Sequence, residues 1–260
     1  MSAAWGRPLV RLGVCTSTNE VARWLAAAGL PEGTAVIAHT QERGRGRQGR
    51  AWSSPPGGLW CSFVLRPPVR TAWGRLSLAS SVATAEAIEQ IVGVRAAIRW
   101  PNDVVVGGRK VAGVLLEAAA AAVVAGIGIN ANVAADDLPE ALRDRAGSLH
   151  ELRGRAVPLE ALFDALRSRL AHWYVVWRND TDGDAGTIID AWSTRDATRG
   201  RHLEVQIGAD HVTGVAEGVD GSGALRVRTA DGALRTVVAG DILTRPISAA
   251  QNGRSEHGDV

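Results

Sequence analysis

Two periods of hydrophobic and polar residues run along this chain, and the pattern changes near residue 200. Before that point, short apolar runs predict strands, and longer segments with apolar residues three or four positions apart predict helices. The predicted strands cover residues 9–14, 35–40, 59–65, 98–100, 104–106, 110–117 and 123–130. The predicted helices cover residues 17–28, 76–92, 158–177 and 188–192. This mixture predicts an α+β fold with helices packed on a mixed sheet.

The sequence of the first predicted helix predicts both its N-terminal cap and its buried face. Ser17 and Glu20 have the spacing of a capping box, in which each side chain accepts a hydrogen bond from the other residue's backbone N–H. The predicted buried face consists of apolar residues at helical spacing, namely Val21, Trp24, Leu25 and Ala28. We therefore expect a helix that begins at a serine cap and packs through its larger apolar residues.

After residue 200 the helical period disappears. Short alternating segments follow, separated by turn sequences rich in Gly and Asp: residues 203–207, 213–219, 225–229 and 234–238. This pattern predicts a small all-β barrel. We expect three parts in the chain, an α+β domain over residues 1–198, a β domain over 199–247 and a polar, disordered tail over 248–260.

The composition excludes several classes of protein. Hydrophobic residues make up 46% of the 260 residues and charged residues 22%, which is typical of a globular protein. Net charge is +2 and the basic residues are spread out except at 43–50, so general nucleic-acid binding is not expected. Because no apolar run reaches the roughly 18 residues of a membrane span, we expect a cytoplasmic protein. The histidines and cysteines have no metal-ligand spacing, so a metal site stays unknown.

Lys110 is the single lysine among 29 basic residues. An arginine is a flat fork and a lysine a compact charge, so the exception suggests a role that arginine cannot fill. Glycines at 107 and 108 predict a hairpin that turns Lys110 back toward the corner Pro101-Asn102-Asp103. By itself this corner is a common turn. Beside Lys110, its amide and carboxylate are candidate site groups.

Residues 41–56 are rich in glycine, arginine, serine and proline and predict a mobile surface loop. The glycine spacing matches part of a dinucleotide-binding pattern, but Pro55 and Pro56 prevent the required helix, and Arg70 stands where an acidic residue is needed. Glycines let a backbone bend closely around a ligand. Four arginines repel one another unless an anion neutralises them: Arg43, Arg45, Arg47 and Arg50. The loop is either a solvated charged segment or a phosphate-binding segment.

Five motifs in order closely resemble the motif set of the biotin–protein ligases. They are residues 16–19 (TSTN), Gln41 with 44–52 (GRGRQGRAW), 99–103 (RWPND), 109–117 (RKVAGVLLE) and 126–130 (GIGIN). The resemblance covers about residues 8–133 in detail. It implies the class II synthetase-like catalytic domain of biotin and lipoate ligases, and the C-terminal segment is similar in kind to that family's SH3-like domain.

The resemblance implies an ATP-dependent ligase. Such an enzyme activates biotin to biotinyl-5′-AMP and transfers biotin to a lysine of the biotin carboxyl carrier domain of a carboxylase. Mg²⁺ is expected to accompany ATP. Because the mixed anhydride hydrolyses in water, the loop is expected to order and close the site when the adenylate forms.

The resemblance also implies three groups of site residues. The catalytic group is Lys110, Arg45, Arg47 and Asp103. The biotin-binding group is Ser17, Thr18, Asn19, Gln41, Arg45, Gly46, Arg47, Lys110 and Gly113. The ATP- and adenylate-binding group is Arg45, Arg47, Arg50, Trp52, Asn102, Lys110 and Asn130. Lys110 is expected between the biotin carboxyl and the α-phosphate, and Asp103 either orients Lys110 or accepts a proton from the acceptor lysine.

Two alternatives stay open from the sequence. A lipoate or octanoyl ligase shares the fold and a catalytic lysine, and a non-catalytic biotin or nucleotide sensor belongs to a different class. The first predicted strand begins within about ten residues of Met1, which leaves no room for a winged helix-turn-helix, so neither DNA binding nor repression is expected. Exposed edge strands in such folds favour a homodimer.

Overall fold

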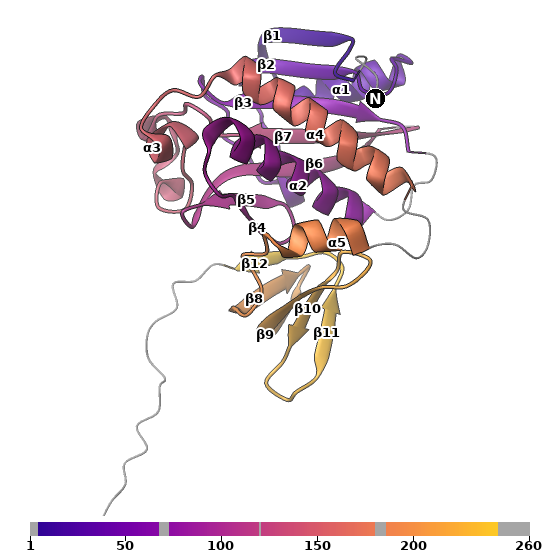
Figure 1. Ribbon diagram of the computed structural model, residues 1–260, viewed down its shortest axis with the longest axis vertical. Helices are drawn as coiled ribbons and strands as arrows, with labels where there is room; N and C mark the ends of the chain where they lie inside the picture. The colour runs from indigo at the N-terminus through magenta and orange to yellow at the C-terminus, as the bar shows by residue number, and fades with distance from the viewer. Residues whose placement is uncertain (1–4, 68–72, 120, 180–185, 244–260) are drawn as a thin grey trace, which may run out of the picture.

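A mixed seven-stranded sheet forms the centre of the larger part of the molecule (Figure 1). The computed structural model describes residues 5–67, 73–119, 121–179 and 186–243. The strand order is β1-β2-β3-β7-β6-β5-β4; β1 and β2 pair in parallel, and the other neighbours pair antiparallel. The strands are β1 (Leu9–Cys15), β2 (Ala35–Gln41), β3 (Leu59–Leu65), β4 (Ala97–Arg99), β5 (Asp103–Val106), β6 (Arg109–Ala119) and β7 (Ala122–Ile129).

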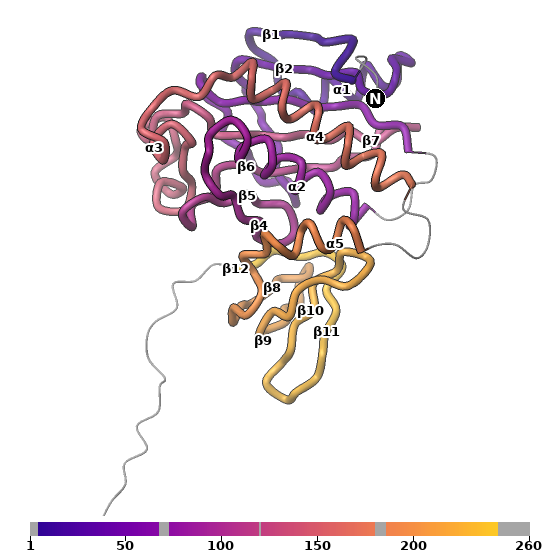
Figure 2. The backbone as a smooth tube through the Cα atoms, viewed as in Figure 1, coloured from indigo at the N-terminus to yellow at the C-terminus, as the bar shows by residue number. Residues whose placement is uncertain are grey.

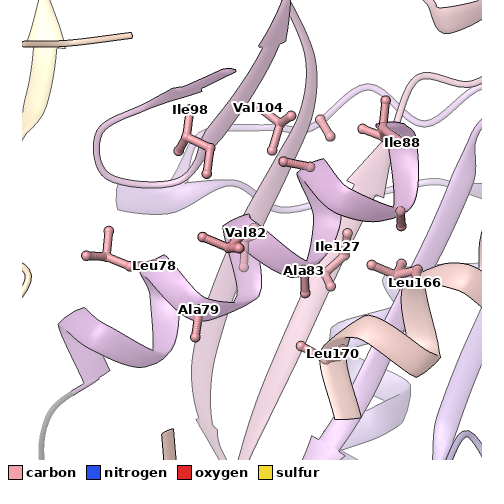
Figure 3. Close-up of a cluster of buried hydrophobic side chains, with 14 of the residues drawn as sticks. Leu78, Ala79, Val82, Ala83, Ile88, Ile98, Val104, Ile127, Leu166 and Leu170 are labelled. Carbon is pink, nitrogen blue, oxygen red and sulfur yellow. The ribbon is translucent and has the colours of Figure 1, made fainter. Parts of the chain in front are cut away.

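Two long helices cover one face of this sheet, α2 (Trp73–Val92) next to the strands and α4 (Leu159–Asn179) beside α2. Figure 3 shows Val82 and Ala83 of α2 in one cluster with Ile127 of β7 and with Leu166 and Leu170 of α4. Small residues dominate α2, which allows close packing on both sides. Its buried hydroxyls donate to carbonyls one turn earlier, so their burial leaves no unpaired donor: Ser80, Ser81 and Thr84.

The opposite face of the sheet carries α1 (Thr18–Ala27) at one end. Alternate strand residues point to the two faces. Val64 of β3 and Val124 of β7 pack against Ala22 and Ala26 of α1. Farther along the same face, the strands carry a serine and glycines in place of large apolar residues, so that end of the face is left open for a cavity.

The buried face of α1 differs from the prediction. Trp24 is 63% exposed and Ala28 is exposed, whereas Asn19, Ala22 and Ala26 are buried. The prediction was wrong because hydrophobic size guided it, while the sheet accepts only small side chains at this contact. Val21 and Leu25 pack at the margin of the contact.

The predicted capping box is also absent. Ser17 is the N-cap residue, but its side chain makes no capping hydrogen bond. The carboxylate of Glu20 instead accepts a hydrogen bond from the Thr16 hydroxyl at 2.6 Å. The prediction failed because spacing alone does not determine which of two adjacent hydroxyls Glu20 engages.

Other predicted elements are confirmed, with shifted ends. The hairpin at residues 107–108 joins β5 to β6, and β7 pairs back on β6 with Ala119 opposite Ala122, although that connection contains no usual turn residue. The sequence did not predict α3 (Leu149–Arg153), and α5 (Gly186–Ser193) is longer than expected. In the part of the chain that the structure describes, no helix is long and apolar enough to cross a membrane.

A five-stranded antiparallel sheet of SH3-like type forms the C-terminal part, in the order β11-β10-β9-β8-β12. The tube in Figure 2 passes from α5 into this sheet. Its strands are β8 (His202–Ile207), β9 (Asp210–Val219), β10 (Leu225–Arg228), β11 (Leu234–Val237) and β12 (Asp241–Leu243). The pattern did not predict β12, which pairs with β8. The predicted disordered tail, 248–260, lies outside the described residues.

The two parts share one hydrophobic core. Leu203, Val205 and Leu225 of the C-terminal sheet belong to the same buried cluster as α2 and the large sheet. The indole N–H of Trp100 donates to the Gly223 carbonyl at 3.1 Å, and the Trp100 backbone N–H donates to the Thr198 hydroxyl at 2.9 Å. These contacts hold the corner at residues 99–103 against the C-terminal sheet.

Candidate active site

A cavity of about 470 Å³ lies between the open end of the α1 sheet face, the loop 41–56 and β12. Every residue that the sequence predicted for the site lines it: Ser17, Thr18, Asn19, Gln41, Arg45, Gly46, Arg47, Arg50, Trp52, Asn102, Asp103, Lys110, Gly113 and Asn130. These residues come from the loop 41–56, from the start of α1, from β2, β5 and β6, and from the end of β7. Folding therefore brings all five sequence motifs to one place.

A buried polar network forms one end of the cavity. The Thr18 backbone N–H donates to Gln41 Oε1 at 2.8 Å, and the Gln41 amide donates to the Ser54 hydroxyl at 2.7 Å. The Ser62 hydroxyl lies 2.6 Å from Asn19 Oδ1, and Asn19 Nδ2 donates to Glu117 at 2.7 Å. Fixed amide and hydroxyl groups of this kind can recognise a neutral ring that both donates and accepts hydrogen bonds.

Glycines on β7 make the room that this network needs. A Cβ atom at Gly126 would lie 2.0 Å from Asn19 Oδ1, and one at Gly128 would lie 2.6 Å from Trp52 Nε1. Both distances are far below van der Waals contact, so a side chain at either position would displace the site residue above it. The glycines of the motif at residues 126–130 are therefore needed to leave room for Asn19 and Trp52, which the sequence alone did not show.

Trp52 lines the cavity above β6 and β7. Its ring packs over the paired residues Gly113 and Gly128, and Lys110 Nζ lies 5.1 Å from the ring centroid. Its Nε1 is buried, and among the described residues it has no hydrogen-bond partner. A buried N–H without a partner is costly, so this atom is a candidate donor to a ligand.

Lys110 and Asp103 form an ion pair on adjacent strands, with Nζ 2.5 Å from Oδ1. A bulge between Val104 and Val105 shifts the register of β5 against β6 and brings the two side chains to the same side. The side chains are 30% and 23% exposed, so the pair is partly shielded from water while one side of Lys110 faces the cavity. A compact positive charge is held there at a defined point.

Two asparagines in the lining serve the backbone as well as the cavity. The Asn102 amide donates to the Val114 carbonyl, and its oxygen lies 3.5 Å from Arg47 Nη1. The Asn130 amide donates to the Gly147 carbonyl at 3.1 Å. These bonds position both side chains and hold the strand ends that frame the cavity.

The arginine loop is folded back on itself. Arg45 forms an isolated bridge with Ala51, and the Gly46 N–H donates to the Arg50 carbonyl at 2.7 Å. Gln48, at φ 53°, adopts the left-handed conformation in the short 3₁₀ turn between them. Burial lowers the pKa of Arg47, which the nearby carboxylates partly offset. The loop thus directs guanidinium groups toward the cavity.

The arginines meet carboxylates that the sequence did not single out. Arg45 lies 3.5 Å from Glu117, and Arg50 lies 2.6 Å from Asp241 of β12. Glu117 is the last residue of the 109–117 motif, which could have identified it. Asp241 is in the C-terminal sheet, in a strand that the pattern did not predict. Leu138, Leu142, Arg145 and Ile242 also line the cavity, and the sequence did not predict them either.

The carboxylates that line the cavity, Asp103 and Asp241, are each paired with a cationic side chain and do not form a cluster. Within the described ranges, no group of three or more His, Cys, Asp or Glu residues could hold a metal ion.

Comparisons with known proteins agree with this geometry. Residues 12–133 match the model of the Biotin/lipoate A/B protein ligase family, and residues 198–245 match the biotin protein ligase C-terminal domain. The biotin--[acetyl-CoA-carboxylase] ligase of Paracoccus denitrificans is 38% identical over 221 residues, covering 82% of this chain and 90% of that protein. The chain belongs to the biotin protein ligase family.

Two further likenesses extend the comparison. A bifunctional ligase/repressor BirA from Bacillus spizizenii is 32% identical, over 91% of this chain and 74% of that protein. The biotin protein ligase of Aquifex aeolicus, solved in complex with biotin and ATP, superposes with a TM-score of 0.81 at 28% identity, covering 91% of this chain and 98% of the other. The C-terminal match separates this biotin protein ligase from the lipoate alternative.

Proposed function

We propose that this chain uses ATP to activate biotin and transfers it to a lysine of a biotin carboxyl carrier domain. In the first step a biotin carboxylate oxygen bonds to the α-phosphorus, the bond to the bridging oxygen breaks, and pyrophosphate leaves. In the second step the acceptor amine attacks the acyl carbon, AMP leaves, and the amine loses a proton. The observation that carries the proposal is the convergence of all five motifs on one cavity around Lys110.

The polar end of the cavity would bind the biotin ring. Ser17, Thr18, Asn19 and Gln41 are buried or half-buried there. Thr18 is hydrogen-bonded to Gln41 and to Ser62, and Asn19 to Ser62. Because their hydrogen bonds are set before the ligand arrives, little orientation entropy is lost on binding. Gly46 and Gly113 would let the ligand approach the backbone closely.

The cationic end would hold the reacting groups. Lys110 would lie between the biotin carboxylate and the α-phosphate and neutralise the charge that builds on phosphorus, which a fixed charge in a shielded site does more effectively than water. Arg45 and Arg47 would clamp the carboxylate and phosphate, with Arg50, Asn102 and Asn130 toward the nucleotide and Trp52 against the adenylate. Asp103 would orient Lys110, with which it is paired, or would accept the proton of the acceptor amine in the second step.

Magnesium would enter as the complex of ATP. The phosphate oxygens of ATP are the ligands that Mg²⁺ prefers, and the ion would leave with pyrophosphate. We propose a cytoplasmic reaction, because ATP and the carboxylase acceptor are both required. Residues 1–198 would carry the chemistry and 199–247 the SH3-like end domain.

We also propose a homodimer through β1. This strand is the last in the order of the large sheet, with β2 on one side, and Val14 on it is 61% exposed. Such edges favour pairing with another strand. Light scattering at several protein concentrations measures the mass in solution, and a monomer at every concentration would exclude the dimer.

The test of function is biotin transfer onto a purified carrier domain with MgATP. We expect transfer by the wild type, strongly reduced transfer by Lys110→Ala, and none when lipoate replaces biotin. A folded wild-type protein that transfers neither acid but still binds biotin would indicate the sensor alternative. Transfer of lipoate instead of biotin would indicate the other branch of the family.

A further inference from the structure

Asp241 links the C-terminal sheet to the arginine loop. Its Oδ1 lies 2.6 Å from Arg50 Nη2 and 3.8 Å from Arg47 Nη1. The side chain is 12% exposed and lines the same cavity as the proposed phosphate-binding groups. The loop arginines therefore meet a carboxylate from another part of the molecule at the place where an anion is expected.

The position of this carboxylate is set by the C-terminal sheet. Asp241 pairs with Gln206 across β12 and β8. A Cβ atom at the preceding Gly240 would lie 2.7 Å from the Gln206 carbonyl oxygen, so a glycine is needed for the chain to enter β12 this closely. The carboxylate is thus held by a strand, not by the loop whose arginines it contacts.

Charge explains why a carboxylate is useful here. The side chain of Arg47 is 21% exposed and that of Arg50 is 61% exposed, so the two guanidinium groups repel each other at the edge of the shielded cavity unless a counter-ion is present. A carboxylate and a phosphate bind the same guanidinium N–H groups in the same way. An incoming phosphate and Asp241 therefore compete for the same donors.

We propose that Asp241 is a positioning residue that holds Arg47 and Arg50 as a counter-ion until the nucleotide's phosphates replace it. The exchange releases the arginine loop from the C-terminal sheet as it engages the ligand. By reciprocity, ATP binding weakens the contact between loop and sheet by the same factor that the contact weakens ATP binding. The inference rests on the proposed function, because it takes ATP as the ligand.

The test compares the affinity of the full chain for MgATP, without biotin, in the wild type and in Asp241→Asn. The asparagine keeps the shape and one acceptor oxygen but removes the charge. We expect Asp241→Asn to bind MgATP more tightly, by a factor on the order of five at low salt, and the gain to shrink as salt rises. Asp210→Asn, which removes an exposed carboxylate of the same sheet, controls for net charge and should leave the affinity unchanged.

A double-mutant cycle shows whether Asp241 acts through the loop. In an Arg50→Gln background the gain from Asp241→Asn should be much smaller, because one of its two partners is gone. Equal or weaker MgATP binding by a folded Asp241→Asn protein would overturn the inference, as would an undiminished gain in the Arg50→Gln background. Melting temperatures establish that the variants fold.

Inorganic pyrophosphate separates this inference from the proposed function. It carries the competing charge but needs no adenylation, so Asp241→Asn should also bind it more tightly. If the wild type binds pyrophosphate but shows no ligase activity, a tighter Asp241→Asn supports the counter-ion role while the function fails. If neither anion binds the wild type, the counter-ion inference fails, and the proposed function is decided separately by biotin transfer.

Discussion

At the scale of single residues, we expect the position of one positive charge to be the most sensitive feature of the site. Lys110 is held 2.5 Å from Asp103 and faces the cavity. Removing a fixed charge that stabilises a transition state costs a factor on the order of 100 to 1,000. We expect Lys110→Ala to lower kcat/KM for biotin-dependent pyrophosphate release by that amount. Lys110→Arg should recover only part of it, because the fork is longer and flatter. A Lys110→Ala enzyme within a few-fold of wild type would contradict the assigned role.

A second prediction at this scale concerns the space above Gly126. In Gly126→Ala the new methyl group would displace Asn19, which would lose its contacts to Ser62 and Glu117. We expect biotin affinity to fall by about tenfold or more, with a loss of unfolding free energy of about 1–3 kcal/mol. Gly13→Ala is the matched control, because a Cβ there meets nothing within 4 Å. Calorimetric titration with biotin measures the affinity of each variant, and equal affinity of the two would refute the steric argument.

At the scale of elements, the arginine loop should become less accessible to proteases when it closes over a ligand. Trypsin cleaves after arginine, and the loop contains Arg43, Arg45, Arg47 and Arg50. We expect cleavage in residues 41–56 to slow when biotin and MgATP are present together, because charge neutralisation orders the loop. Cleavage at the exposed Arg235 on β11 should stay unchanged and serves as the internal reference. The same loop cleavage rate with and without ligands would argue against closure.

The helix α1 shows where periodicity is insufficient at this scale. Its bounds were predicted within a residue or two, because they depend on the hydrophobic spacing of neighbouring residues and on the stop at Gly29–Pro31. Its orientation was not predicted correctly, since Trp24, the largest apolar residue of the helix, is exposed. The polar Asn19 is buried because partners on β3 and β6 satisfy it. No hydropathy rule anticipates a polar residue whose partners lie on distant strands.

At the scale of the whole molecule, Trp100 joins the site corner to the C-terminal sheet. Trp100→Phe keeps an aromatic ring but removes the donor to the buried Gly223 carbonyl. We expect a loss of unfolding free energy of about 1–3 kcal/mol, from the unpaired carbonyl and the smaller ring. The control Trp24→Phe, at an exposed position, should change it by less than about 0.5 kcal/mol. Urea denaturation compares the two, and equal losses would show that the Trp100 contact does not couple the parts.

The sequence alone predicted most of the helices and strands, the five motifs and the motif residues that line the cavity. Hydrophobic period, turn residues and short motifs depend on neighbours in the chain, so they can be read without the fold. The single lysine, the hairpin before it and the proline corner are only a few residues apart, so their proximity in space could be predicted from the sequence.

The tertiary structure decided which side of α1 is buried, why β7 needs glycines, and that Asp241 faces the arginine loop. Each of these depends on side chains from segments far apart in sequence meeting at a particular distance. Asp241 is the clearest case, because its strand of three residues is too short to show a hydrophobic pattern and is defined by its pairing with β8. Its partner arginines belong to a loop whose position is set by the other sheet, so no local rule could join them.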